Sequence, residues 1–207
     1  MSESWPATLA RIGGVYDGLV ARWGHDPRAC DYGRAESQRA KFVVLAEAMP
    51  LAGKRVLDIG CGFADFADHL AATAPGIAYR GIDISEAMVA AARRRRPDLD
   101  LRRLDILTEE PGGAFDLVTA NGIFYLLGAG AEGVMQQLIA RMFALCREAV
   151  AFTSLSAWAA DREPGEFYAD PAATLSFCRS LTPHLVLRHD YHARDFAVYL
   201  YRERRVP

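Results

Sequence analysis

Two acidic residues at the ends of short apolar runs are the groups in this 207-residue sequence best placed to bind a ligand. The first run ends at Asp58 and leads into the turn Gly60-Cys61-Gly62, which a helical pattern follows. Glycine is favoured where the backbone needs a positive φ or where a ligand approaches closely. The second run ends at Asp83, about 20 residues beyond the turn, where a carboxylate can accept hydrogen bonds from both hydroxyls of a ribose. The spacing therefore predicts a nucleoside-binding strand–turn–helix unit.

The residues after the glycine turn indicate which nucleoside it binds. A dinucleotide fingerprint needs a small residue where this chain has Asp65, whereas the small residue here is Ala64. The acids Asp58 and Asp65 also suit a cationic ligand better than a pyrophosphate. The order acid-x-Gly-x-Gly-x-small resembles the motif of the class I S-adenosylmethionine-dependent methyltransferases, which carry glycine where this chain has Ala64. Their cofactor, S-adenosyl-L-methionine, carries a sulfonium, an ammonium and a carboxylate, but no phosphate.

The resemblance implies roles for residues at the carboxyl ends of the strands, where ligands of open parallel sheets bind. It implies that Asp83 binds the ribose and that Ile84 and Met88 flank the adenine. It also implies that Asp105 accepts a hydrogen bond from the adenine amino group and that the backbone N–H of Ile106 meets a ring nitrogen. The expected cofactor-binding residues are Asp58, Gly60, Cys61, Gly62, Asp83, Ile84, Met88, Asp105, Ile106 and Asn121.

Each of these assignments has a structural alternative. Asp83 could be a helix-start acid before Ser85, a position that the helix dipole favours. Asp105 could be a turn residue, and Ile84 and Met88 could belong to the hydrophobic core.

A polar turn, His189-Asp190-Tyr191-His192, supplies candidates for the acceptor side of the reaction. It leaves the carboxyl end of a predicted strand, so we expect it at the pocket rim. A histidine there can deprotonate a substrate hydroxyl, because its pKa lies near neutrality. His189 is the first candidate for this catalytic role and His192 the second, and either could instead be exposed or bonded to the backbone. Positions three apart on a strand face opposite sides, so no metal site is expected from this pair.

The N-terminal segment supplies further candidates. The resemblance implies that side chains such as Tyr16, Tyr32, Gln38 and Lys41 bind the cofactor carboxylate or the substrate. Tyr16 is the third candidate for a catalytic role. For Lys41 we prefer the interpretation of a solvated cation on a helix.

Alternating strand and helix patterns predict an α/β fold with a parallel sheet and helices on both faces. We expect a single domain, 1–207, with an N-terminal helical cap over 1–50 and a cofactor-binding core over 51–207. The pair Gly13-Gly14 should weaken the first helix and could break it. The resemblance implies a mostly parallel, seven-stranded, Rossmann-like sheet that ends in an antiparallel hairpin. Strands are expected near 54–59, 78–83, 100–104, 115–120, 148–154, 184–189 and 196–201, and helices near 6–23, 34–49, 64–73, 86–95, 131–146 and 171–181.

Composition narrows the classes of partner. With 51% hydrophobic residues and a net charge of −2, the chain is not built to bind nucleic acid by bulk electrostatics. The run Arg93–Arg96 is interpreted as a solvated helix end. No apolar run approaches a membrane span. The four cysteines are scattered, which argues against disulfides and a zinc site and favours the cytoplasm.

Together with the composition, the resemblance implies a methyltransferase that acts on a nitrogen or oxygen of a small molecule. The stretches 167–171, 188–191 and 198–201 also resemble a group of short bacterial methyltransferases. Two alternatives stay open: a nucleic-acid or protein methyltransferase of the same fold, and a catalytically silent protein that binds the cofactor. The oligomeric state is not predicted.

Overall fold

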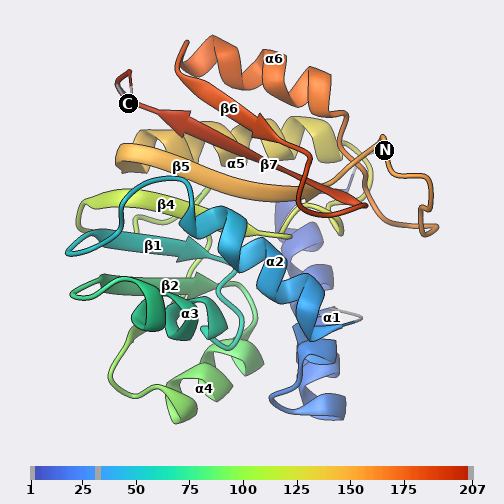
Figure 1. Cartoon of the computed structure of the whole chain (residues 1–207). Coiled ribbons are helices and arrows are strands. Elements are labelled where there is room, and N and C mark those ends of the chain that lie inside the picture. The colour runs from blue at the N-terminus through green and yellow to red at the C-terminus, as the bar shows by residue number, and fades with distance from the viewer. Residues whose placement is uncertain (1–2, 31–33, 205–207) are drawn as a thin grey trace.

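The computed structural model describes residues 3–30 and 34–204 and contains a seven-stranded sheet (Figure 1). Its strands are β1 (Arg55–Ile59), β2 (Ala78–Asp83), β3 (Asp100–Arg103), β4 (Phe115–Asn121), β5 (Cys146–Leu155), β6 (Leu185–Arg188) and β7 (Asp195–Tyr201). They lie in the order β3-β2-β1-β4-β5-β7-β6. Neighbours from β3 to β5 are parallel, while β7 runs antiparallel to both β5 and β6. The predicted fold class is confirmed. Of the candidates from the sequence, Tyr32 lies outside the described residues.

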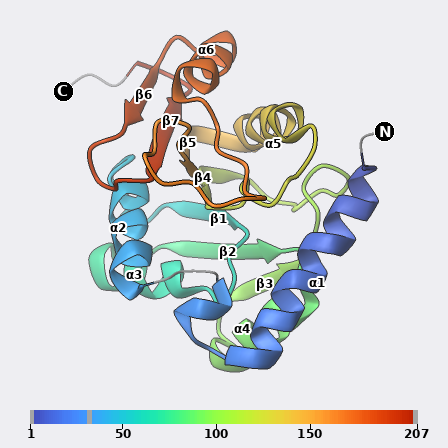
Figure 2. The same cartoon turned by 90° about the vertical axis from the view of Figure 1, so that its right-hand side faces the viewer.

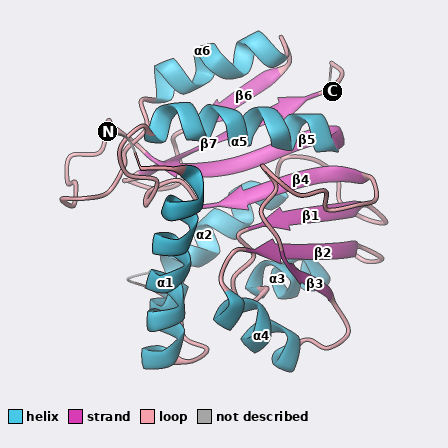
Figure 3. Ribbon diagram, turned by 180° about the vertical axis from the view of Figure 1, so that it is seen from behind, coloured by secondary structure: helices cyan, strands magenta, loops and turns pink. Residues whose placement is uncertain are grey.

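Helices cover both faces of the sheet because side chains alternate between its faces along each strand. Val56 packs with α2 (Ala35–Ala46) and α3 (Asp65–Thr73), whereas Leu57 lies in the cluster of α5 (Ala131–Leu145). Helix α6 (Pro171–Leu181) lies beside α5 and the strand pair β6–β7, as Figure 3 shows from behind. The order of strands reverses direction at β1, between β2 and β4. Crevices at such switch points are where ligands bind in open α/β sheets.

Helix α1 (Trp5–Trp23) stands across the carboxyl ends of the strands (Figures 1 and 2). It is continuous through Gly13-Gly14, so the glycine pair does not break it. Contacts with the core at Trp5 and Asp17 hold it on both sides of that pair, and Gly24, at φ 60°, ends it. A short 3-10 helix, η1 (Pro27–Cys30), and α2 follow. Helix α2 ends at Ala46, earlier than the 49 expected from the sequence.

Helix α4 (Glu86–Arg95) packs against both α1 and the edge strand β3. Its C-terminal arginines differ from the solvated end that we expected. Arg95 forms ion pairs with Asp65 and Asp68, and Arg96 with Asp68 and Asp98. These contacts tie α4 to α3. None of the helices in the described ranges is both long enough and apolar enough to span a bilayer.

Candidate cofactor and acceptor site

The glycine turn after β1 adopts a backbone that most residues avoid. Gly60 and Gly62 have φ values of 71° and 52°, and Ala64, at 62°, is the non-glycine residue with positive φ in the described chain. A left-handed conformation costs a residue with a Cβ roughly 1–2 kcal/mol. A Cβ on Gly60 would also come within 2.4 Å of the Ile123 side chain, so this position has no room for one. The turn therefore needs its glycines, and Ala64 occupies the third such position under strain.

Asp83 connects the glycine turn to the start of α4. Its carboxylate accepts hydrogen bonds from the backbone N–H groups of Gly62 and Ser85, each at 2.9 Å. Burial raises the pKa of Asp83, and these N–H groups oppose the shift without cancelling it. Asp83 thus performs the local helix-start role, and it also lines the main cavity, where an oxygen can accept further hydrogen bonds.

Asp58 lies below the turn, with the residue 2% exposed. Tyr79 from β2 donates to one carboxylate oxygen at 2.6 Å, and Thr119 from β4 donates to the other at 3.0 Å. Burial raises the pKa of Asp58 to about 6, although both hydroxyls lower it. Asp58 therefore braces β1 against both neighbours at the switch point.

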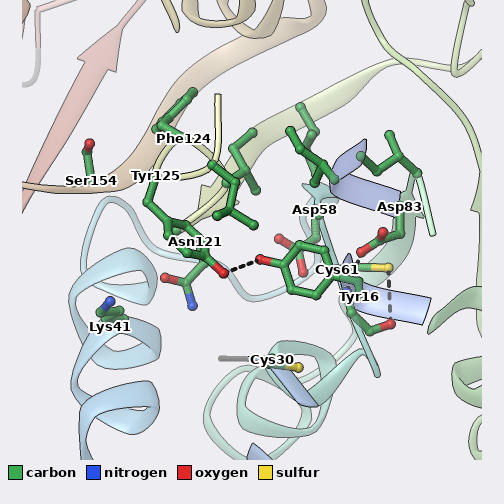
Figure 4. A pocket seen from close by; sticks show the side chains of 18 of the residues that line it. Tyr16, Cys30, Lys41, Asp58, Cys61, Asp83, Asn121, Phe124, Tyr125 and Ser154 are labelled. Carbon is green, nitrogen blue, oxygen red and sulfur yellow. Dashed lines mark hydrogen bonds between the residues drawn. The ribbon is translucent and has the colours of Figure 1, made fainter. Parts of the chain in front are cut away.

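A cavity of about 260 Å³ opens at the carboxyl ends of β1, β2 and β4. All the expected cofactor residues line it: Asp58, Gly60, Cys61, Gly62, Asp83, Ile84, Met88, Asp105, Ile106 and Asn121. Figure 4 shows Asp83 on one side of this pocket and Lys41 on the other, with Asn121 between them. The structure thus brings these residues together. Their individual roles toward the cofactor stay predictions.

Asp105 is engaged by the chain itself. It accepts hydrogen bonds from the backbone N–H of Leu107, the hydroxyl of Thr108 and the indole N–H of Trp5. The bonds to Leu107 and Thr108 are those of a turn residue, which was the structural alternative for Asp105. The third anchors α1 beside the position where the resemblance implies the adenine.

Helix α1 closes this side of the cavity through two further contacts. Asp17 accepts hydrogen bonds from the Ser85 hydroxyl at 2.6 Å and from the backbone N–H of Ala87 at 3.2 Å. The hydroxyls of Tyr16 and Tyr125 meet at 3.0 Å across the pocket (Figure 4). Tyr16, a predicted catalytic residue, therefore lies at the cavity between the two sides of the pocket.

His189 does not line the cavity, so its expected place at the pocket rim is wrong. Its Nε2 lies 2.7 Å from the Ser156 hydroxyl, and its ring stacks on Phe196 and contacts Trp158. The reason is the order of the strands. Strand β6 is the outermost strand beyond β7, which separates its carboxyl end from the switch point.

His192 lines the cavity, since the chain returns there to begin β7. Its Nε2 lies 3.0 Å from the Ser37 hydroxyl, and its Nδ1 lies 2.8 Å from Asp195. The sequence reasoning missed Ser37 and Asp195, because neither belongs to a motif. A carboxylate three residues after a histidine was the available signal.

Lys41 is buried rather than solvated, which corrects our preferred interpretation. Its Nζ lies 2.8 Å from Asp195, and the side chains are 8% and 1% exposed. Burial alone would raise the pKa of Asp195, but His192 and Lys41 hold it below its ordinary value. The lysine therefore compensates a buried carboxylate at the cavity wall.

The fold agrees with the comparison with known families. A methyltransferase-domain family model matches residues 57–149, which span β1 to the first part of β5. This match, the relatives and the shared fold support the predicted resemblance to the class I S-adenosylmethionine-dependent methyltransferases, with S-adenosylmethionine as the cofactor.

Its curated relatives include trans-aconitate 2-methyltransferases. The protein from Paracidovorax citrulli is 35% identical over 122 residues, which cover 57% of this chain and 46% of that protein. The protein from Escherichia coli is 39% identical over 88 residues, which cover 42% of this chain and 34% of that protein. The matches thus span at most about half the length of these relatives.

Solved structures share the fold at low sequence identity. A DhpI–S-adenosylhomocysteine complex superposes with a TM-score of 0.70 at 14% identity and covers 98% of this chain and 100% of that chain. Magnesium protoporphyrin IX methyltransferase from Synechocystis PCC 6803, with S-adenosylhomocysteine bound, gives 0.64 at 13% identity, with coverage of 98% and 90%.

Proposed function

We propose that this chain transfers a methyl group from S-adenosylmethionine to a nitrogen or oxygen of a small molecule. One observation carries the proposal: a single cavity joins the cofactor-side residues around Asp83 to polar side chains of α2 and β7. We also propose that 1–50 act as a cap on the core, 51–207, within one domain. The four free cysteines support a reducing compartment such as the cytoplasm.

The charges of the cavity fit this cofactor. Carboxylates outnumber permanent cations among the described residues that line it. The carboxylates are Asp58, Asp65, Asp83, Asp105, Glu166 and Asp195, and the cations are Lys41 and Arg194. A cofactor with a sulfonium and an ammonium against a single carboxylate is attracted to such a surface, and a pyrophosphate is repelled.

The chain's own groups divide the work of holding the cofactor. Asp83 binds the ribose hydroxyls, Ile84 and Met88 flank the adenine, and the backbone around Gly62 faces the methionine part. Asn121 lies beside this path, where the Thr153 hydroxyl donates to its side-chain oxygen at 2.8 Å and so orients the amide. The bound cofactor supplies an electrophilic methyl group on its sulfonium.

Most of the catalytic effect then comes from positioning. Holding the acceptor in line with the methyl group, in a site closed to water, lowers the barrier by roughly 7–11 kcal/mol in well-oriented intramolecular reactions. The Tyr16–Tyr125 contact spans the pocket and supports a role for Tyr16 in confining the acceptor. His192 is the candidate base, while His189 retains at most an indirect role through Ser156.

A carboxylate acceptor is a second candidate, because the curated relatives are named trans-aconitate 2-methyltransferases. A carboxylate is already deprotonated and needs no base. Against it stands the excess of acids at the cavity, which disfavours a polyanion. The two cations are also paired already, Lys41 with Asp195 and Arg194 with Glu166.

The test is transfer of label from methyl-labelled S-adenosylmethionine into fractionated cell extracts. We expect the label in a small molecule that survives nuclease and protease treatment. Label that either treatment abolishes would instead favour a nucleic-acid or protein acceptor. Binding of S-adenosylhomocysteine without any label transfer would favour the catalytically silent alternative.

A further inference from the structure

We infer that Ser37, His192 and Asp195 form a proton-accepting relay, and that the acceptor therefore enters as a neutral hydroxyl rather than as a carboxylate. We call these three residues the acceptor relay. The inference rests on the proposed methyl transfer and specifies the acceptor of that reaction.

The relay is assembled from two elements far apart in the sequence. Ser37 lies in the first turn of α2, and Lys41 follows it one turn later on the same side of the helix. His192 lies in the loop before β7, and Asp195 is the first residue of that strand. The contacts Ser37 Oγ–His192 Nε2, His192 Nδ1–Asp195 and Asp195–Lys41 Nζ measure 3.0, 2.8 and 2.8 Å.

The tautomer of His192 follows from these distances. The Asp195 carboxylate has only acceptor atoms, so an imidazole nitrogen 2.8 Å from it must carry a proton. The backbone N–H of Arg194 also donates a hydrogen bond to Nδ1, at 3.2 Å, and this bond would favour the other tautomer, with the proton on Nε2. An unprotonated Nδ1 would place its lone pair against those of the Asp195 carboxylate, and the two would repel. We therefore let the shorter contact, with Asp195, decide that Nδ1 carries the proton. In the neutral ring Nε2 is then the unprotonated nitrogen, and it accepts a hydrogen bond from Ser37.

Lys41 allows His192 to remain neutral. The Asp195 carboxylate is 1% exposed, and a buried carboxylate needs a compensating charge. Lys41 supplies that charge at 2.8 Å without His192. The imidazole is therefore free to take up a proton during the reaction. The resulting imidazolium would face the negative charge of Asp195, as in other histidine–carboxylate pairs.

The relay faces the reaction space. Ser37, His192 and Asp195 all line the cavity that also contains Asn121 and Tyr125. In Figure 4, Lys41 and Ser154 mark this side of the pocket, away from Asp83. An acceptor hydroxyl at this side can take the place of the Ser37 hydroxyl on Nε2 or donate to Ser37, which then donates to Nε2.

Methyl transfer to a hydroxyl needs only the acceptor, the cofactor and the acceptor relay. The acceptor oxygen forms a bond to the methyl carbon as the carbon–sulfur bond breaks, and the sulfur keeps that electron pair as a neutral thioether. The hydroxyl proton passes to Nε2 of His192, directly or through Ser37, and later leaves to solvent. A carboxylate would release no proton and would leave the relay without a function.

Imidazole nitrogen NMR tests the tautomer directly. We would label the protein with ¹⁵N-histidine, saturate it with S-adenosylhomocysteine and record it at about pH 8.5, two units above the ordinary histidine pKa. His192→Gln identifies the resonance. We expect the Nδ1–H tautomer for His192 and a shift toward Nε2–H in Asp195→Asn. An Nε2–H tautomer in the parent protein would overturn the relay.

Turnover supplies the second measurement, with catechol as the hydroxyl probe and trans-aconitate as the carboxylate probe. His192→Gln should lower catechol methylation by about 10²–10⁴-fold, the range for a lost general base, with little change in KM for the cofactor. Ser37→Ala should lower it by a smaller factor. His184→Gln is the matched control, because His184 precedes β6 at the other end of the sheet. The inference would be overturned if trans-aconitate were methylated faster than catechol and His192→Gln left the rate for trans-aconitate unchanged.

Calorimetry with S-adenosylhomocysteine distinguishes a failure of the proposed function from a failure of the acceptor relay. If the parent protein does not bind it, the proposed function itself fails. If the protein binds it but His192 carries its proton on Nε2, only the relay fails, whether or not either probe is methylated. Unchanged binding in each variant shows that the substitution has not disrupted the fold.

Discussion

The two sides of the cavity are built in different ways. Most of the cofactor side comes from two short stretches, 58–65 and 83–88, which a single strand–turn–helix–strand unit brings together through the Gly62–Asp83 hydrogen bond. The acceptor side joins Ser37 to His192, which are 155 positions apart. Local order can be read from consecutive residues, whereas the acceptor side exists only once α2 and β7 have packed on the sheet.

The two sides also differ in how they treat buried carboxylates. On the cofactor side, Asp58 and Asp83 are held by hydroxyls and backbone N–H groups, and burial raises the pKa of both. On the acceptor side, His192 and Lys41 lower the pKa of Asp195. A surface of under-compensated acids suits a cationic cofactor, while a neutral cluster suits proton transfer.

The largest expected effect lies on the cofactor side. Asp83→Ala should remove two charge-assisted hydrogen bonds to the ribose, each worth about 1.5–3 kcal/mol, and should weaken cofactor binding by at least about 100-fold. Asp98→Ala is the control, because this exposed carboxylate pairs with Arg96 and does not line the cavity. Calorimetric titration with S-adenosylhomocysteine measures both. Equal losses would mean that Asp83 has no special place in the cofactor site.

The next effect concerns stability on the acceptor side. Lys41→Met leaves Asp195 buried without its cation, and breaking a buried ion pair costs about 3–5 kcal/mol. We expect a loss of that order in denaturant unfolding and a nearly unchanged affinity for S-adenosylhomocysteine. The partly exposed ion pairs of Arg188 with Glu47 and Asp190 provide the control, since Arg188→Met should cost less than Lys41→Met, about 1 kcal/mol. A fall in cofactor affinity equal to that of Asp83→Ala would erase the distinction between the two sides.

The raised pKa of Asp58 predicts a pH dependence of the cofactor side. The folded protein holds this proton more tightly than the unfolded chain, with a pKa of about 6 against 3.8. The associated stability is therefore present below about pH 4 and is lost as the pH rises through about 6. Across that interval, Asp58→Asn should gain on the order of 2–3 kcal/mol relative to the parent. Unfolding curves of both proteins at several pH values test this, and a constant difference would show that the carboxyl titrates normally.

The smallest expected effect tests the glycine turn. Ala64→Gly should relieve the left-handed strain and raise the free energy of unfolding by about 1 kcal/mol, which corresponds to a rise in Tm of about 2–4 °C. Ala67→Gly is the control inside α3, where glycine should lower stability by about 1 kcal/mol. Thermal unfolding separates the two outcomes. A loss of stability in both variants would show that the Ala64 methyl group contributes more by packing than it costs in strain.

Much of the fold was predictable from the sequence. Apolar runs that end at Asp58 and Asp83 are strands β1 and β2, and the alternating pattern gave the parallel sheet with its final hairpin. The cofactor candidates followed from the strand ends together with the resemblance of the glycine motif to a known family, and all of them line one cavity. The continuity of α1 through Gly13-Gly14 could not be predicted from the sequence, because it depends on contacts of α1 with the core.

The sequence by itself determined the strand–turn–helix unit, since hydrophobic period, glycine spacing and terminal acids all act between near neighbours. It also contained both histidines, but it could not rank them. Only the tertiary structure decided that His189 stacks on Phe196 outside the cavity while His192 enters it beside Asp195 and Lys41. That choice depends on the insertion of β7 between β5 and β6, a pairing of distant segments that no local pattern encodes.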